Sequence, residues 1–177
     1  MKCITIFALS LLCLAGCSQA PQERHYKEIV IDAPSANSLV WQVPAGWVQG
    51  AGDQMRLVTF YSVNDPRAID CSITTLTGEA GGLDANLERW LGQLGISSTD
   101  EILNGLEQSA QSVTSADGHE IKVFDLTHLQ GISNKSMLAA VMNLEGLTVF
   151  IKMTGVKDAL DANRENYLQL LSSIKQE

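Results

Sequence analysis

The sequence has few of the side chains that usually carry enzyme chemistry. Its 177 residues include three histidines and four cysteines, and none of the motifs HExxH, HxH, GxSxG or the P-loop occurs. His25, His119 and His128 are predicted to lie in a tether, a hairpin turn and a strand end. A catalytic triad or a zinc site needs histidine beside further partners. We therefore expect no catalytic residue, no metal and no cofactor, and we predict that the chain is not an enzyme.

Basic side chains are also scarce. There are 12 lysines and arginines against 20 aspartates and glutamates, which gives a net charge of -8 and a pI near 4.8. Nucleic acids and anionic lipid surfaces attract basic proteins. An acidic surface therefore predicts no nucleic-acid partner and no electrostatic binding to anionic lipid.

No apolar run is as long as the roughly 20 residues needed to span a bilayer. The run from Cys3 to Leu14 follows Lys2 and fits the apolar region of a secretory signal. It ends in Leu14-Ala15-Gly16-Cys17, which resembles the lipobox of bacterial lipoproteins. The resemblance implies that residues 1–16 are a signal peptide, that Cys17 is acylated, and that Ser18 directs the protein to the outer membrane, facing the periplasm. The alternative is an ordinary signal peptide with an incidental cysteine.

Removal of the leader would take Cys3 and Cys13 with it, and lipid would occupy Cys17. Cys71 then remains alone, which excludes an intramolecular disulfide. Because Ile69, Cys71 and Ile73 share one face of a predicted strand, we expect an inert core thiol. The polar residues 17–26 read as a lipidated N-terminus and tether, and residues 27–177 as one globular domain.

The remaining pattern predicts an α+β fold. In the helix expected over 83–94, Leu83, Leu87, Trp90, Leu91 and Leu94 form one apolar stripe. Shorter and longer helices are expected at 99–106 and 157–174. Alternating apolar residues and Asp-Gly or Glu-Gly turns predict strands at 28–32, 39–43, 55–63, 68–76, 110–115, 120–128, 136–144 and 147–154. We expect a mostly antiparallel sheet of about seven strands with helices packed on its faces.

Several short fragments resemble a known group. They are the turn over 43–47, Met55-Arg56, LTGEAGG with NLERWLGQL, VFIKMTG, and the closing LLSSIK. Together they are similar to bacterial lipoproteins of an uncharacterised family and, more distantly, to PsbP-like domains. The resemblance implies an α/β/α sandwich and a role in binding or assembly. It supplies no catalytic residues.

The candidate binding residues follow from their types, because arginine and tryptophan are the usual anchors of interfaces. They are Trp47, Arg56, Asn86, Arg89 and Trp90. The alternative is structural: the tryptophans fill the core, and Arg89 forms an ion pair with Glu79 or Asp70.

The glycine-rich stretch 78–82 precedes a helix and is interpreted as turn geometry rather than as an anion site. These features favour a membrane-anchored module that binds a protein partner of the cell envelope. A small-ligand carrier and an envelope hydrolase without a recognisable motif remain the alternatives.

Overall fold

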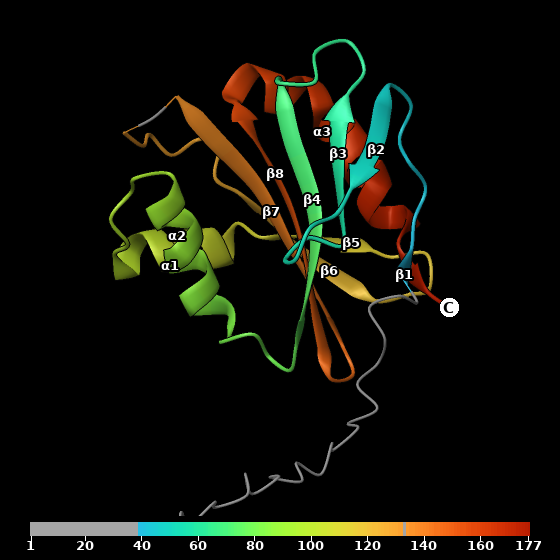
Figure 1. The fold of residues 1–177 in the computed structure, drawn as a ribbon. Helices are drawn as coiled ribbons and strands as arrows, with labels where there is room; N and C mark the ends of the chain where they lie inside the picture. The colour runs from blue at the N-terminus through green and yellow to red at the C-terminus, as the bar shows by residue number, and fades with distance from the viewer. Residues whose placement is uncertain (1–38, 133) are drawn as a thin grey trace, which may run out of the picture. The chain divides into compact units, whose positions relative to one another are not determined.

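The computed structural model describes residues 39–132 and 134–177, all within one compact unit (Figure 1). The signal peptide, Cys17, the tether and the strand predicted at 28–32 lie outside the described residues. None of the helices in the described part of the chain is long and apolar enough to cross a membrane.

A seven-stranded antiparallel sheet forms the middle layer, with the strand order β2-β3-β4-β8-β7-β6-β5. Three helices pack on its two faces, which confirms the α+β class predicted from the sequence (Figure 1). The strands are β2 (Trp47–Ala51), β3 (Val58–Ser62), β4 (Ile69–Thr77), β5 (Gln111–Thr114), β6 (Glu120–Asp125), β7 (Lys135–Leu144) and β8 (Leu147–Val156).

The α3 core lies on one face, beneath α3 (Lys157–Ser173). Leu170 and Leu171 of this helix are fully buried against strand residues such as Phe60 and Ile73. Tyr167 is also fully buried, and its hydroxyl donates to the carbonyl oxygen of Ile151 at 2.7 Å. The hydrogen bond lets a polar tip be buried without the cost of an unsatisfied group.

Cys71 belongs to this α3 core and has no exposed surface. Burial raises the pKa of its thiol far above the ordinary range, because the thiolate would have to be formed away from water. The prediction of a buried core thiol is confirmed.

The α1 core lies on the opposite face, beneath α1 (Leu83–Gln93) and α2 (Asp100–Gln108). Trp90 packs edge-on to Phe150, with ring centres 6.0 Å apart, and lies 6.2 Å from Phe124. Thr99 caps α2 by accepting a hydrogen bond from the amide of Ile102. Strands in the middle of the sheet carry apolar residues toward both cores because successive side chains alternate between faces.

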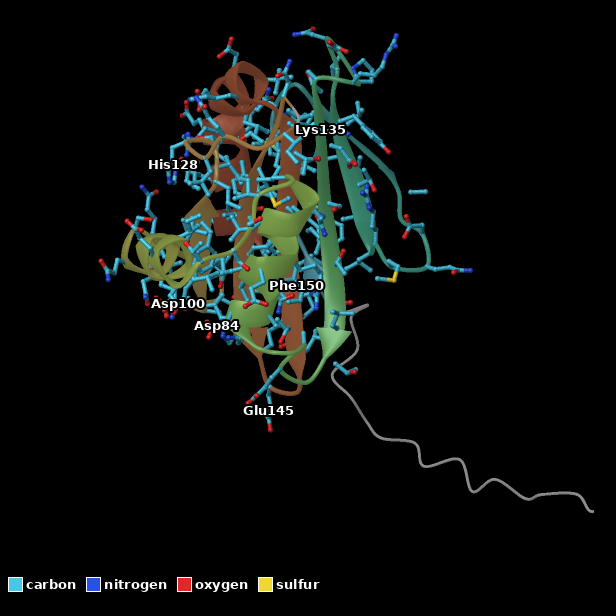
Figure 2. The ribbon with its side chains drawn as sticks, turned by 90° about the vertical axis from the view of Figure 1, so that its left-hand side faces the viewer. Asp84, Asp100, His128, Lys135, Glu145 and Phe150 are labelled. Atoms are coloured by element: carbon cyan, nitrogen blue, oxygen red, sulfur yellow. The ribbon has the colours of Figure 1, made fainter. Side chains whose placement is uncertain are left out.

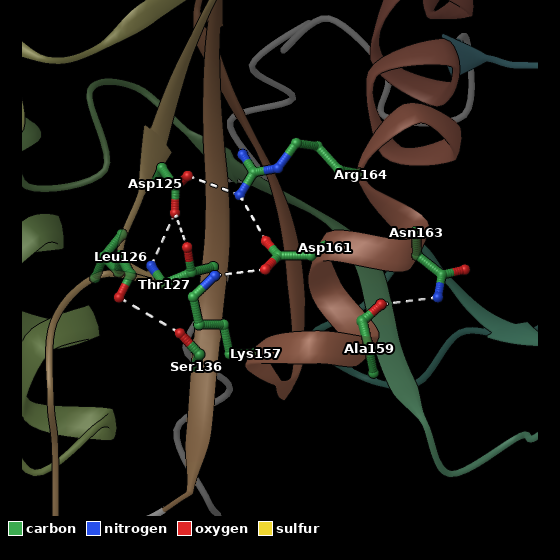
Figure 3. Close-up of polar contacts among 9 residues, drawn as sticks. All are labelled: Asp125, Leu126, Thr127, Ser136, Lys157, Ala159, Asp161, Asn163 and Arg164. Atoms are coloured by element: carbon green, nitrogen blue, oxygen red, sulfur yellow. Dashed lines mark hydrogen bonds and ion pairs between the residues drawn. The ribbon is translucent and has the colours of Figure 1, made fainter.

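An ion pair from Arg164, near the middle of α3, fastens this helix to the end of β6 (Figure 3). Arg164 bridges Asp125, at 2.7 Å, and Asp161, at 3.2 Å. Lys157 also pairs with Asp161. Burial alone would raise the pKa of Asp125, but hydrogen bonds from Thr127 and the pairing with Arg164 outweigh it and lower that pKa. The folded state therefore favours the ionised carboxylate.

Two elements differ from the sequence prediction. Trp47–Ala51 was not predicted as a strand, yet it forms the edge strand β2. Gly50 in this strand lies under the ring of Tyr61, and a Cβ at this position would come within 2.8 Å of that ring. The strand predicted at 39–43 shrinks to β1 (Leu39–Val40), which pairs with the unpredicted β9 (Lys175–Gln176) in a separate two-stranded sheet. The pattern of apolar residues gives no sign of either pairing.

The strand predicted to begin at Met55 begins instead at Val58. Asp53 explains the delay, because its carboxylate accepts hydrogen bonds from the amides of Met55 and Arg56, both at 2.8 Å. These bonds hold the preceding residues in a turn.

Candidate functional site

The α1 face of the sheet is covered over only part of its width. Residues of β6, β7 and β8 are buried beneath α1 and α2, whereas none of the described residues of β2 or β3 belongs to the α1 core. Val48 of β2 is 47% exposed on this face, and Tyr61 of β3 is half-buried. Two hollows lie along this partly covered face.

The larger one, called here the large hollow, has a volume of about 650 Å³ and lies where α1 begins. Phe150 lies beneath α1, and Glu145 marks the turn at this end of β7 and β8 (Figure 2). The walls combine polar and apolar side chains. They are Glu79, Asn86, Glu120, Lys122, Asn143 and Thr148, with Leu83, Val141, Leu144 and Phe150.

The glycine-rich turn before α1 forms one wall of the large hollow. Asn86 is buried, and its amide nitrogen donates to the carbonyl oxygens of Ala80 (3.1 Å) and Gly82 (2.6 Å). The amide of Gly78 donates to Gly146, and that of Gly82 donates to Glu79. Because these backbone donors are already engaged, the arrangement agrees with the interpretation of 78–82 as turn geometry rather than an anion cradle.

Asn86 also joins this turn to the helix surface. Arg89 donates to the Asn86 side-chain oxygen at 2.6 Å, so two of the candidate residues are in contact. The polar atoms of Asn86 are thereby used in holding the turn, and its role in this structure is to shape the wall.

The other candidate residues lie elsewhere. Trp90 is buried in the α1 core, and Trp47 is buried in the α3 core on the opposite face, where its indole N–H donates to Asn163 at 2.8 Å. Arg56 forms an ion pair with Asp70. The five residues predicted as candidates therefore do not form one patch.

The smaller hollow, called here the small hollow, has a volume of about 180 Å³ and lies near the other end of α1. Arg56 binds both carboxylate oxygens of Asp70, at 2.8 and 3.1 Å. Lys152 on β8 donates to the side-chain oxygen of Gln93 at 2.8 Å. Desolvation, followed by the charge of Arg56, lowers the pKa of the Lys152 ammonium.

The acids and histidines of the described residues are mostly engaged or exposed. Glu120, in the large hollow, accepts from Ser112 at 2.6 Å. A hydrogen bond with Asp84 raises the pKa of Glu107. His119 lies 3.7 Å from Asp117 in an exposed hairpin turn. Within 39–132 and 134–177, no three histidine, cysteine or acidic side chains are grouped to hold a metal ion.

Sequence reasoning did not single out Glu120, Lys122, Asn143 or Gln93 as site residues. They reach the hollows from segments far apart in the chain, which only the folded sheet brings together. One local signal was present: Lys152 interrupts the apolar strand 147–153, which marks a place where β8 does not face a sealed core.

No family model and no curated protein matches this chain. Among solved structures it is similar to the cyanobacterial PsbP protein CyanoP of Synechocystis sp. PCC 6803, with 14% identity and a TM-score of 0.49 over 80% of this chain and 88% of that one. A PsbP protein is thus among the solved structures to which this chain is similar.

Two further structures are similar. LpqN, involved in cell envelope biogenesis of Mycobacterium tuberculosis, has 12% identity and a TM-score of 0.41 over 77% of this chain and 83% of its own. A protein of Bacteroides thetaiotaomicron has 9% identity and a TM-score of 0.44 over 79% of this chain and 45% of its own. At these values the similarities carry no conclusion about function.

Proposed function

We propose that this chain is a lipoprotein of the bacterial cell envelope whose domain binds a protein partner and catalyses no reaction. Acyl chains on Cys17 anchor it to the outer membrane, and the domain faces the periplasm. The basis for the anchor is the sequence Leu14-Ala15-Gly16-Cys17 after a short apolar run. Two or more acyl chains are sufficient for stable anchoring.

The large hollow is the observation that carries the binding role. Its volume of about 650 Å³ is well above that of an ordinary packing defect, and it opens on the partly covered face of the sheet. Its walls offer apolar contact from Leu83 and Phe150 beside polar groups such as Glu79 and Lys122. Mixed walls of this kind suit a protruding segment of a protein partner.

The polar groups around the hollow favour binding over catalysis. Thr148 donates to the carbonyl of Gly78 at 2.6 Å, and Asn86 and Glu120 are hydrogen-bonded within the fold. Nucleophilic catalysis needs a nucleophile beside a base that a third group orients. The lining residues of the described chain include no histidine, cysteine or serine.

Small-ligand carriage is the second candidate. Ligand pockets usually have volumes of about 300–1,000 Å³ and mostly apolar walls, and the large hollow falls in this range. A carrier would hold an amphipathic molecule with its apolar part against Phe150 and Val141.

Cys17→Ala tests the anchor, with Cys13→Ala as the matched control because Cys13 lies in the proposed leader. The expected result is that Cys17→Ala loses metabolic labelling by palmitate and leaves the membrane fraction, while Cys13→Ala keeps both. Membrane fractionation of Cys17→Ala identical to that of the wild type would contradict the anchor.

A photo-crosslinking side chain at Asn143, on the rim of the large hollow, tests the partner. The matched control is the same side chain at Gln169, which is exposed on α3 at the opposite face. We expect one envelope protein to be crosslinked from position 143 and not from 169. A bound small molecule with no protein adduct would favour carriage, and equal adducts from both positions would contradict a specific site.

A further inference from the structure

The small hollow concentrates positive charge in an acidic protein. Two basic side chains that the proposal uses, Arg56 and Lys152, line it against the single carboxylate of Asp70. Elsewhere acidic side chains are in excess, by 20 to 12 over the whole sequence. The excess of positive charge in the small hollow, in a protein of negative net charge, is the feature that needs an explanation.

The one carboxylate does not balance these charges. Asp70 is committed to Arg56 through two hydrogen bonds of 2.8 and 3.1 Å, the bidentate geometry that arginine prefers. The Lys152 ammonium donates to a neutral acceptor, the side-chain amide oxygen of Gln93. Attraction by Asp70 is the weakest influence on the Lys152 pKa, after desolvation and the repulsion from Arg56. A half-buried cation is therefore placed beside a second cation.

The fold fixes the position of Lys152, because this residue lies in the middle of the sheet. Lys152 is directly opposite Ser72 on β4 and Ala139 on β7, so it projects from the middle of the sheet and not from an edge. Ser72 and Thr154 add hydroxyl groups to the walls, and these can donate as well as accept. A volume of about 180 Å³ accommodates a group the size of a phosphate.

We propose that the small hollow binds a phosphate group, held by the Lys152 ammonium and the Arg56 guanidinium on the α1 face of the sheet. The phosphate could come from a lipid headgroup or from free inorganic phosphate, and both present the same oxygen acceptors. The anion supplies the charge that Asp70 does not, and water in the hollow is displaced. This proposal does not depend on the partner or the occupant of the large hollow.

The test measures the unfolding midpoint of the full-length protein in a non-ionic detergent as inorganic phosphate is added. Sodium chloride at equal ionic strength is the reference, because a ligand that binds the folded state raises the midpoint with its concentration. We expect phosphate to raise the midpoint of the wild type and chloride not to. Equal responses to phosphate and chloride would overturn the proposal.

Variants assign the effect to the hollow. Lys152→Met should weaken the apparent phosphate affinity about tenfold, as expected for one charge-assisted hydrogen bond, and Lys152→Arg should retain it. Asp70→Asn keeps an acceptor for Arg56 but removes the negative charge, so it should tighten binding severalfold. Lys157→Met, on α3, is the control and should respond like the wild type. An unchanged phosphate response in Lys152→Met, or weaker binding in Asp70→Asn, would contradict the site.

Glycerol phosphate distinguishes the two sources. Binding as tight as that of inorganic phosphate supports a lipid headgroup, because the site then accepts an esterified phosphate. Binding of inorganic phosphate alone supports the free ion.

Discussion

The two faces of the sheet are built from the same strands but differ in how much of each face is covered by a hydrophobic core. One continuous core covers the α3 face from β2 to β6, whereas the core on the α1 face lies beneath α1 and α2 and includes no residue of β2 or β3. Both hollows discussed above lie on the α1 face. The comparison indicates that the α3 face supplies most of the stability, whereas the α1 face carries the groups available for binding.

Two neighbouring residues of β8 show the contrast. Ile151 is fully buried in the α3 core, and its carbonyl accepts the hydroxyl of Tyr167. Lys152 points to the other face and lines the small hollow. One step along a strand thus separates a packing residue from a proposed ligand residue, because side chains alternate.

The largest loss of stability is expected from a substitution in the α3 core. Leu171→Ala should lower the free energy of unfolding by about 3 kcal/mol, since it leaves a cavity under α3 where the side chain is fully buried. Urea unfolding measures the change. Leu168→Ala, at a partly buried position of the same helix, is the control and should cost clearly less. Similar losses at both positions would show that the α3 core is not closely packed.

A smaller effect should follow from removing one buried hydroxyl. Tyr167→Phe is expected to lower the free energy of unfolding by about 1 kcal/mol, because the carbonyl of Ile151 loses its 2.7 Å hydrogen bond. Tyr61→Phe, on the open face, is the matched substitution and should change stability less. A larger loss of unfolding free energy for Tyr61→Phe than for Tyr167→Phe would contradict the view that the α3 face supplies most of the stability.

Acid should weaken the contacts that fasten α3 to β6. The folded-state pKa of Asp125 is lowered below its unfolded value of about 3.9, so its stabilisation is complete above that value and is lost as pH falls through the folded pKa. The stability difference between the wild type and Asp125→Asn should therefore shrink from about pH 5 to about pH 2. Thermal unfolding at several pH values measures it, and a constant difference would contradict the ionised pairing with Arg164.

The smallest effect, and the only gain in stability, is expected for Lys152 on the α1 face. Desolvation lowers the pKa of Lys152 in the folded state, so the unfolded chain binds more protons and stability rises with pH between the two pKa values. Without phosphate, Lys152→Met should be slightly more stable than the wild type at neutral pH and should lose this pH dependence. A clear loss of stability would mean that the bond to Gln93 outweighs desolvation.

Much of the fold could be predicted from local patterns. Alternation identified β3, β4, β7 and β8, and the apolar stripe identified α1 within one residue of its observed end at Gln93. Pairings between distant segments could not be predicted this way. β1 and β9 are two residues each, and their strand conformation comes from pairing with one another rather than from their own composition.

The candidate site was less accessible to sequence reasoning. Tryptophan and arginine were selected by residue type, but Trp47 and Trp90 fill opposite cores, as the structural alternative held. Arg56 alone of the selected residues lines the small hollow, and Asn86 alone lines the large one. Side-chain type indicates what a residue can do, and only the sheet register determines which side chains meet.

The pairing of β1 with β9 has a mechanical consequence. Leu39 is opposite Gln176 and Val40 is opposite Lys175, so the chain enters and leaves the domain at a single corner. Tension applied between the two ends would unzip this short ribbon before it strained the main sheet. A reporter fused after Glu177 would emerge beside Leu39, because Leu39 is paired with Gln176.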